Sequence, residues 1–289
     1  MLLFELAFRD WKKLSSFVKT CESTITHSDT AMLKIKPKGA YIMLTDFESM
    51  CCLEVRLVDL NKNMLKMNAP EVSVKIMLDS FVAILRTILK HKHSAVLFAE
   101  DDSPFTLQIR EVIGQTNKTV EVHKVESTEH RARVYHIIST NEFRKRSASF
   151  AQFKIPNVEF NKIITTQCIA SGNSGGVGEI VVTPKPDSPD AASIKFAVRN
   201  NGGMALGITV HTHAKAATVP LQHTPREKIN MKYCLTYLKR SQNLFANTAD
   251  SVTVYVSELG MMLQTDVKDN HSVVVFIADV SDEDLESYA

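Results

Sequence analysis

Ser174 lies in the glycine-rich segment Gly172–Gly176 (GNSGG), a kind of segment that can expose a serine hydroxyl as a nucleophile. Such a nucleophile needs a histidine as general base and a carboxylate that orients the histidine. Here Asn173, and not an acid, precedes the serine, and the segment falls between a predicted helix and a predicted strand. We interpret it as a turn and keep a hydrolase that uses Ser174 as the enzymatic alternative.

Two histidine pairs, His91 with His93 and His211 with His213, have the i, i+2 spacing that places both rings on one face of a strand. A metal is conceivable there, but no nearby carboxylate or thiolate completes a tetrahedral set of ligands. We favour the interpretation that His91 and His93 extend the cationic end of a helix.

Five cysteines are an odd number and form no CxxC pair, which argues against disulfides and against a zinc ribbon: Cys21, Cys51, Cys52, Cys168 and Cys234. The sequence also lacks a phosphate loop, a dinucleotide fingerprint and paired catalytic carboxylates. We therefore predict that the protein is not an enzyme and uses no metal and no cofactor.

The remaining candidates for a functional site are the lysines and arginines on the predicted helices. Helical periods occur in Arg9–Glu22, Ser80–His91, Val158–Ala170 and Asn230–Gln242. Their apolar stripes are, in order, Trp11, Leu14, Val18 and Cys21; Phe81, Ile84, Leu85 and Ile88; Phe160, Ile163, Ile164 and Cys168; and Met231, Cys234, Leu235 and Leu238. The polar faces carry eleven cations: Arg9, Lys12, Lys13, Lys19, Arg86, Lys90, Lys92, Lys162, Lys232, Lys239 and Arg240. Acids lie mainly at the helix ends, where they can cap the helix or face its dipole: Asp10, Glu22, Asp79 and Glu159.

Short strands surround these helices and predict an α+β fold. They are β-branched or aromatic and bounded by turn residues: Leu2–Phe8, Ala31–Ile35, Ala40–Thr45, Cys52–Val58, Val72–Met77, Ala95–Ala99, Phe105–Ile113, Val120–Val125, Arg133–Ile138, Gly178–Thr183, Ser193–Val198, Ala205–His211, Ser251–Ser257, Met261–Asp266 and Ser272–Ala278.

The order of elements repeats after about 150 residues, which indicates a duplicated domain. We predict a first domain over residues 1–140, a connector over 141–150 (NEFRKRSASF) and a second domain over 151–289 that ends in the acidic tail Ser281–Ala289. The length of 289 residues fits two domains, and the apolar content of 44% fits globular ones. No apolar run approaches the roughly 20 residues of a membrane helix, and we expect an intracellular protein.

A net charge of +2 does not by itself predict a nucleic-acid partner. The placement of the cations on the predicted helices does predict one. If each half packs its two helices on one side of its sheets, the cations face the same way. Such a lining binds phosphates without reading bases. Because the polar faces lack aromatics for base stacking, they favour duplex over single-stranded DNA. For one helix alone, a solvated charged face is the better explanation of the cations.

The sequence resembles the DNA sliding clamps of the proliferating cell nuclear antigen family over most of its length, at low identity. The segments that carry the resemblance are Gly39–Leu57, Val158–Gly172, Gly178–Thr183, Ile194–Gly203, Met231–Leu244 and His271–Val280. The resemblance implies two copies of a β-rich clamp domain, each with two helices on antiparallel sheets. It also implies a ring, with a homotrimer favoured over a dimer, that encircles duplex DNA in the nucleus. Such a ring would tether DNA polymerase and other replication or repair proteins, and a clamp loader could place it on DNA.

The resemblance also implies two contact regions. Partner proteins would insert short hydrophobic peptides into a groove formed by Thr45, Phe47, Ser49, Phe276, Ile277, Ala278 and Val280. Neighbouring subunits would pair through two edge strands, which we place at Phe105, Leu107 and Ile109 and at Ile180 and Val182. The sequence departs from the family at Ser49, where the family has a histidine, and at Asp279, where it has a proline and a basic residue. These departures put the groove's peptide preference in doubt.

Two other versions of the fold remain open. One is a herpesvirus-type polymerase accessory subunit, dimeric or monomeric, in which case the location is the host-cell nucleus. The other is one subunit of a checkpoint clamp.

Overall fold

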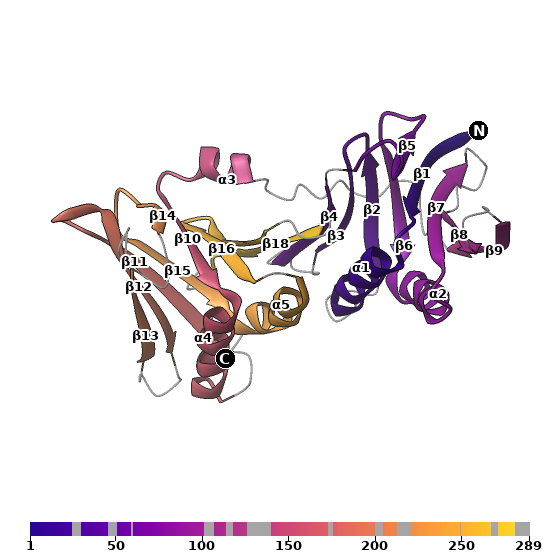
Figure 1. The fold of residues 1–289 in the computed structure, drawn as a ribbon. Helices are drawn as coiled ribbons and strands as arrows, with labels where there is room; N and C mark the ends of the chain where they lie inside the picture. Colours follow the sequence, from indigo (N-terminus) through magenta and orange to yellow (C-terminus); the bar gives the residue numbers. More distant parts are fainter. Residues whose placement is uncertain are drawn as a thin grey trace. The chain divides into compact units, whose positions relative to one another are not determined.

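The structure is a computed structural model that describes residues 1–24, 30–45, 51–58, 60–100, 107–113, 118–125, 140–172, 176–199, 205–212, 221–248, 250–266 and 271–280. The chain divides into two compact units. Unit 1 comprises residues 1–46, 53–136 and 267–272, and unit 2 comprises residues 47–52, 137–266 and 273–289. Each unit is built from antiparallel strands and two main helices, which confirms the predicted α+β class (Figure 1).

Unit 1 contains two sets of neighbouring strands and one helix pair. One set has the order β5-β1-β7-β8-β9 and the other the order β4-β3-β2-β6. The elements are β1 (Leu2–Phe8), α1 (Trp11–Thr24), β2 (Thr30–Lys36), β3 (Gly39–Thr45), β4 (Cys51–Leu57), β5 (Leu65–Met67), β6 (Val72–Met77), α2 (Leu78–Lys90), β7 (Ser94–Glu100), β8 (Leu107–Ile113) and β9 (Lys118–Val125).

Unit 2 repeats this order of elements after the short helix α3. Its strand sets have the orders β14-β10-β16-β17-β18 and β13-β12-β11-β15. The elements are α3 (Thr140–Arg146), β10 (Phe150–Pro156), α4 (Asn157–Ala170), β11 (Val177–Lys185), β12 (Ser188–Arg199), β13 (Ala205–Thr212), β14 (Leu221–His223), β15 (Ile229–Cys234), α5 (Leu235–Thr248), β16 (Ser251–Ser257), β17 (Gly260–Thr265) and β18 (His271–Ala278). In the described part of each unit, nine strands and two main helices follow one another in the same order, as expected of a duplicated domain.

Most predicted elements are confirmed, and the differences concern short or ambiguous segments. The strands Leu2–Phe8, Val72–Met77 and Ser251–Ser257 have the predicted bounds. The short strands β5 and β14 and the strand β10 were not predicted, and α3 forms inside the expected connector. The predicted strand Arg133–Ile138 lies outside the described residues.

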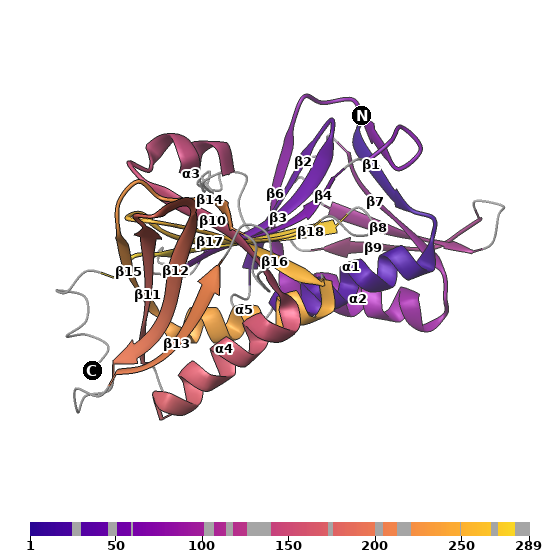
Figure 2. The ribbon, with the colours of Figure 1, turned by 60° about the vertical axis from the view of Figure 1, so that its left-hand side comes forward.

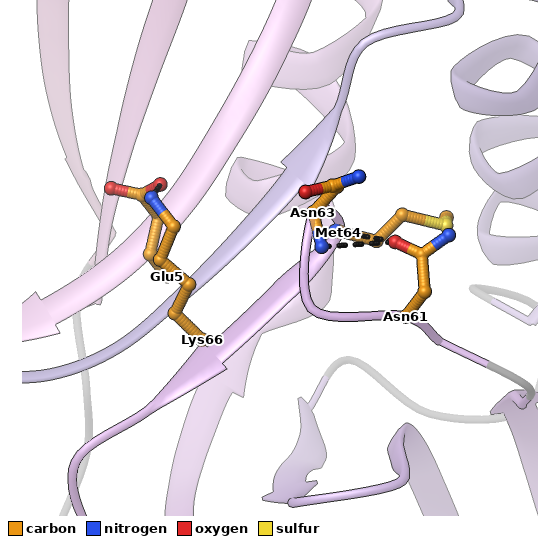
Figure 3. Close-up of polar contacts among 5 residues, drawn as sticks. All are labelled: Glu5, Asn61, Asn63, Met64 and Lys66. Atoms are coloured by element: carbon orange, nitrogen blue, oxygen red, sulfur yellow. Dashed lines mark hydrogen bonds and ion pairs between the residues drawn. The ribbon is translucent and has the colours of Figure 1, made fainter.

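β5 is held on β1 by polar contacts (Figure 3). The Asn61 side chain accepts hydrogen bonds from the backbone N–H groups of Asn63, at 2.9 Å, and Met64, at 3.2 Å. This Asx turn leads the chain into β5. Lys66 then pairs with Glu5 across the strands, with 3.0 Å between Nζ and Oε1. β5 has three residues, of which only Leu65 is buried, and this is too short for a periodic signal in the sequence. The strand therefore depends on these local contacts and could not be predicted from a pattern.

Each unit has its own aromatic core beneath its helix pair. In unit 1, Phe17 stacks on Phe8 at 5.0 Å between centroids and meets Phe81 edge to face at 6.4 Å. In unit 2, Phe160 of α4 meets Phe245 of α5 at 5.9 Å. Asn157 also donates a buried hydrogen bond of 2.9 Å to the backbone oxygen of Phe245. These contacts fix the rotation of each helix and so decide which residues face outward. Among the described residues, no helix is both long and apolar enough to cross a membrane.

We predict that Gly260→Ala destabilises the protein more than Gly172→Ala. Both glycines have positive φ, 141° at Gly260 and 73° at Gly172. A Cβ at Gly260 would lie 2.4 Å from the backbone oxygen of Ile277, whereas one at Gly172 would meet nothing within 4 Å. We expect a loss of about 1 kcal/mol at Gly172, from backbone strain alone, and more than about 2 kcal/mol at Gly260. Urea unfolding measures both. Equal losses would show that the hairpin between β16 and β17 relaxes around the new methyl group.

Candidate nucleic-acid interface

α1 buries its predicted apolar stripe and exposes lysines. Leu14, Val18 and Cys21 are buried, as predicted. The Asp10 carboxylate accepts a 2.9 Å hydrogen bond from the Lys12 backbone N–H, which confirms the predicted N-terminal cap. Lys12 and Lys19 are exposed and Lys13 is half-buried. Arg9 is exposed but precedes the helix, so it belongs to the chain that enters it.

α2 presents a similar surface, and one of its cations pairs with an acid of α1. Phe81, Leu85 and Ile88 are buried, while Arg86 and Lys90 are exposed. Arg86 Nε lies 2.5 Å from Glu22 Oε1 of α1, so this cation is shared with an acid of the neighbouring helix. Exposed pairs of this kind contribute little stability and are screened by salt. Arg86 therefore remains exposed, but the nearby Glu22 carboxylate partly offsets its positive charge.

The segment His91–His93 turns the chain and does not extend α2 as predicted. α2 ends at Lys90, and Lys92 has a left-handed φ of 57°. The backbone N–H groups of His91 and His93 both donate to the Ile88 oxygen, at 3.3 Å each. His93 Nδ1 contacts the buried carboxylate of Glu111 on β8. Lys92 is exposed but lies beyond the helix, because a left-handed residue ends it.

α4 is the least cationic of the four helices. Its apolar stripe is buried at Phe160, Ile163, Ile164 and Cys168, as predicted. Lys162 is exposed and pairs with Glu159 one turn earlier, 2.8 Å from Nζ to Oε1. The outer surface also includes Val158 and Ile169, which are 66% and 67% exposed.

α5 begins five residues later than predicted, which moves Lys232 off the helix. Residues Ile229–Cys234 form β15, which pairs with β11 from Val177↔Cys234 to Val182↔Ile229. The side chains alternate, with Ile229, Met231 and Tyr233 buried. Lys232 is half-buried, and its backbone N–H donates to the Asp279 carboxylate at 2.7 Å. Met231 therefore belongs to a strand, and only Lys239 and Arg240 supply cations on α5, both exposed.

Eight of the eleven predicted cations thus lie on helices: Lys12, Lys13, Lys19, Arg86, Lys90, Lys162, Lys239 and Arg240. Within each unit the two helices contact each other, and Figure 2 shows α1 beside α2 and α4 beside α5. In unit 2, Lys239 of α5 lies near the Cys168 thiol of α4, whose pKa is raised by burial and lowered to a lesser degree by that lysine. Each pair of contacting helices therefore carries cations on side chains that are exposed or half-buried.

No competing catalytic or metal site emerges from the described residues. Their histidines, cysteines and acids form no cluster of three that could hold a metal ion. All five cysteines are free, and burial raises the pKa of the Cys21 thiol far above its ordinary range. Ser174 and His213 lie outside the described residues, and the side chain of His211 does too.

The expected subunit edges are wrong by one strand in each unit. Leu107 and Ile109 lie on β8, which is paired on both sides, with β7 and β9. Ile180 and Val182 lie on β11, which is paired with β12 and β15. Their backbone groups are already used, so they cannot pair with another chain. Among the described strands, β9 and β13 are terminal strands of their sheets, each paired on one side. Phe105 lies outside the described residues.

The described part of the expected peptide groove is largely covered by the chain itself. Phe276, Ile277 and Val280 are buried, and Ala278 is half-buried. Phe143 of α3 is fully buried and packs edge to face on Phe276, at 6.4 Å, and on Tyr255, at 6.3 Å. Phe47, Ser49 and the side chain of Thr45 lie outside the described residues. Sequence reasoning missed Phe143, because a helix of seven residues is too short to show an apolar stripe.

Comparison with known proteins supports the fold alone. No protein-family model matches the chain, and no curated protein matches its sequence. Among solved structures, the crystal structure of proliferating cellular nuclear antigen from Entamoeba histolytica is similar, with a TM-score of 0.69 and 14% sequence identity. The match covers 97% of this chain and 100% of that one. The chain therefore has the sliding-clamp fold of proliferating cell nuclear antigen.

Proposed function

We propose that this protein is a DNA sliding clamp, a ring that encircles duplex DNA and tethers a DNA polymerase and other replication proteins. The observation that carries the proposal is the repeated placement of cations on the outer surface of both helix pairs, in a fold that solved clamps share. In this proposal the protein does no chemistry, acts in the nucleus and depends on partners for catalysis.

Charge numbers suit sliding better than tight binding. Three chains with eight helical cations each would offer about two dozen positive charges. A duplex segment roughly 30 Å long carries about 18 phosphates, at one charge per ~1.7 Å of axis. Long lysine side chains can exchange phosphates because none of these contacts fixes a register. In this proposal ring closure, and not affinity, supplies the lifetime on DNA.

Ring closure would use the corrected edges. β9 of one subunit and β13 of the next are different surfaces, so their pairing is heterologous and closes only when the rotation between subunits does. Support comes from the terminal places of β9 and β13 in the strand order, since a terminal strand can act as a template for another strand. A partner peptide would have to bind beside α3, or displace Phe143 from Tyr255 and Phe276.

We predict that Lys12→Glu combined with Lys239→Glu weakens binding to linear duplex DNA and shortens the products of the cognate polymerase. Both lysines are exposed on helix surfaces, so folding should be unaffected. Losing two phosphate contacts per chain should reduce the slope of log K against log salt concentration by about 2 for each chain that contacts the duplex, and by up to about 6 for a ring of three chains. Fluorescence anisotropy over a salt series measures the slope. Lys195→Glu, an exposed cation on β12, is the matched control and should leave it unchanged. An unchanged slope in the double variant would remove the helices from the DNA-binding surface.

We predict a particle of three times the chain mass of 32.3 kDa in sedimentation equilibrium. Two edges that complete each other at a rotation of one third of a turn close after three copies. A mass of two chains would favour the herpesvirus-type arrangement instead. A monomer at micromolar concentration would count against a self-assembling ring and leave a checkpoint-type subunit that requires other chains.

A further inference from the structure

α3 is anchored on unit 2 in a fixed orientation. Phe143 is its buried anchor. After the helix, the Ser147 backbone N–H and hydroxyl both donate to the Phe143 backbone oxygen, at 3.0 and 2.7 Å. The Ala148 backbone N–H then donates to Glu258 Oε1 at 2.6 Å. The cationic last turn of α3, with Arg144, Lys145 and Arg146, is therefore held in place on the outside of the sheet.

Arg144 is oriented by its neighbours while it stays exposed. Its Nη2 donates to Gln152 Oε1 at 2.7 Å. Its guanidinium carbon lies 5.6 Å from the Tyr255 ring centroid and 5.9 Å from that of Phe150. A guanidinium held this way loses little further freedom when it binds a carboxylate with two hydrogen bonds.

A second arginine and a histidine complete the surface. His223 stacks on Phe150 with 4.0 Å between centroids. The backbone N–H of Arg226 donates to the Ser149 hydroxyl at 3.0 Å, which joins its loop to the end of α3. Burial, then the charges of Arg144 and Arg226, lower the pKa of His223. We call Arg144, Lys145, Arg146, Phe150, His223 and Arg226 the connector patch.

The cations of the connector patch have no acidic partner among the described residues. None of its four cations forms an ion pair with a residue in the described part of the chain. Lys145, Arg146 and Arg226 are exposed, as is Arg144. An unpaired cluster of four cations next to aromatic rings is suited to an anionic partner.

The connector patch lies on the other side of its sheet from α4 and α5. Along β10, Phe153 and Ile155 are fully buried, whereas Phe150 and Gln152 point to the alternate side and contact Arg144. Figure 2 shows α3 above strands β10, β16 and β17, with α4 and α5 below them. The patch is therefore separate from the helix cations that we assign to DNA.

We propose that the connector patch binds an acidic peptide segment of a partner protein, a run of aspartate and glutamate. The proposal rests on the proposed function, because a clamp acts through partners. Single-stranded nucleic acid fits less well, because it needs successive open aromatic faces. In this patch Tyr255 is buried, Phe150 is half-covered by His223, and only the His223 ring is exposed.

We predict that a fluorescein-labelled peptide of eight glutamates binds the full-length protein and that Arg226→Ala weakens this binding about fivefold to tenfold. Anisotropy without DNA at low salt measures the affinity. Lys195→Ala removes one exposed cation elsewhere in unit 2 and is the matched control, with less than a twofold effect expected. Arg144→Ala should match Arg226→Ala, and circular dichroism should show both variants folded.

Three results would overturn the peptide proposal: no binding to the wild-type protein, equal losses from Arg226→Ala and Lys195→Ala, or tighter, Arg226-dependent binding of an eight-nucleotide thymidine oligomer. The last result would make the patch a nucleic-acid surface. Binding of duplex DNA by Arg226→Ala should equal that of the wild type. Loss of peptide binding with retained duplex binding therefore tests the patch, whereas loss of both would count against the clamp assignment itself.

We predict that Arg226→Ala raises the pKa of His223, and that saturating octaglutamate raises it in the wild type. The pKa is lowered by burial and by two cations, so the neutral ring is favoured; removing a cation or adding carboxylates favours the charged ring. The NMR shift of the His223 ring proton over a pH titration measures the change. An unchanged pKa in both experiments would separate Arg226 and the peptide from this histidine.

Discussion

The arrangement depends on one constraint: each helix pair must bury its apolar stripe against its own sheets. The rotation of each helix about its axis is fixed by buried aromatic rings: Phe17 packs between Phe8 and Phe81, and Phe160 packs against Phe245. Once these rings are buried, lysines that occupy the remaining positions must face outward. No lysine needs a binding partner for this to happen, since burying an unpaired ammonium is far more costly than exposing it. The cationic surface is thus a product of packing, which decides which cations are available to the proposed DNA partner.

The two units have the same order of elements but different outer surfaces. α1 and α2 carry five of the eight helical cations, while α4 carries only Lys162, which is paired with Glu159. α4 instead exposes Val158 and Ile169. A duplex beside unit 2 would therefore meet its charge mainly at Lys239 and Arg240 of α5. Such uneven charge favours a loose and mobile contact, because phosphates are attracted at separated places and not along a continuous groove.

Sequence patterns predicted what is periodic and missed what depends on neighbours. The strands of six or seven residues and the Asp10 cap follow from local rules. Residues Met231, Cys234, Leu235 and Leu238 fit a helical period, yet Met231 also fits the alternation of β15, and only pairing with β11 decides between them. The prediction of the edge strands was wrong for a related reason. Which strand is last in a sheet depends on the strand order, and no feature of β8 or β11 reports that another strand lies beyond it. Phe143 was missed because a helix of seven residues has too little length for a stripe.

Asp279 shows how a departure from the family can serve the fold while it changes the surface. Its carboxylate accepts from the Lys232 backbone N–H, and its own N–H donates to the Leu259 oxygen at 3.4 Å. The next residue, Val280, donates to the Lys232 oxygen at 3.0 Å and is buried. A proline at this position would lack the N–H for Leu259 and the carboxylate for Lys232. The chain after β18 is therefore held on β15 by the Asp279 carboxylate and by the Val280 N–H. Because Leu259 adjoins Glu258, which holds the Ala148 N–H at the end of α3, the same turn also supports the connector patch. Asp279 and the cationic last turn of α3 are thus supported by the same turn between β16 and β17.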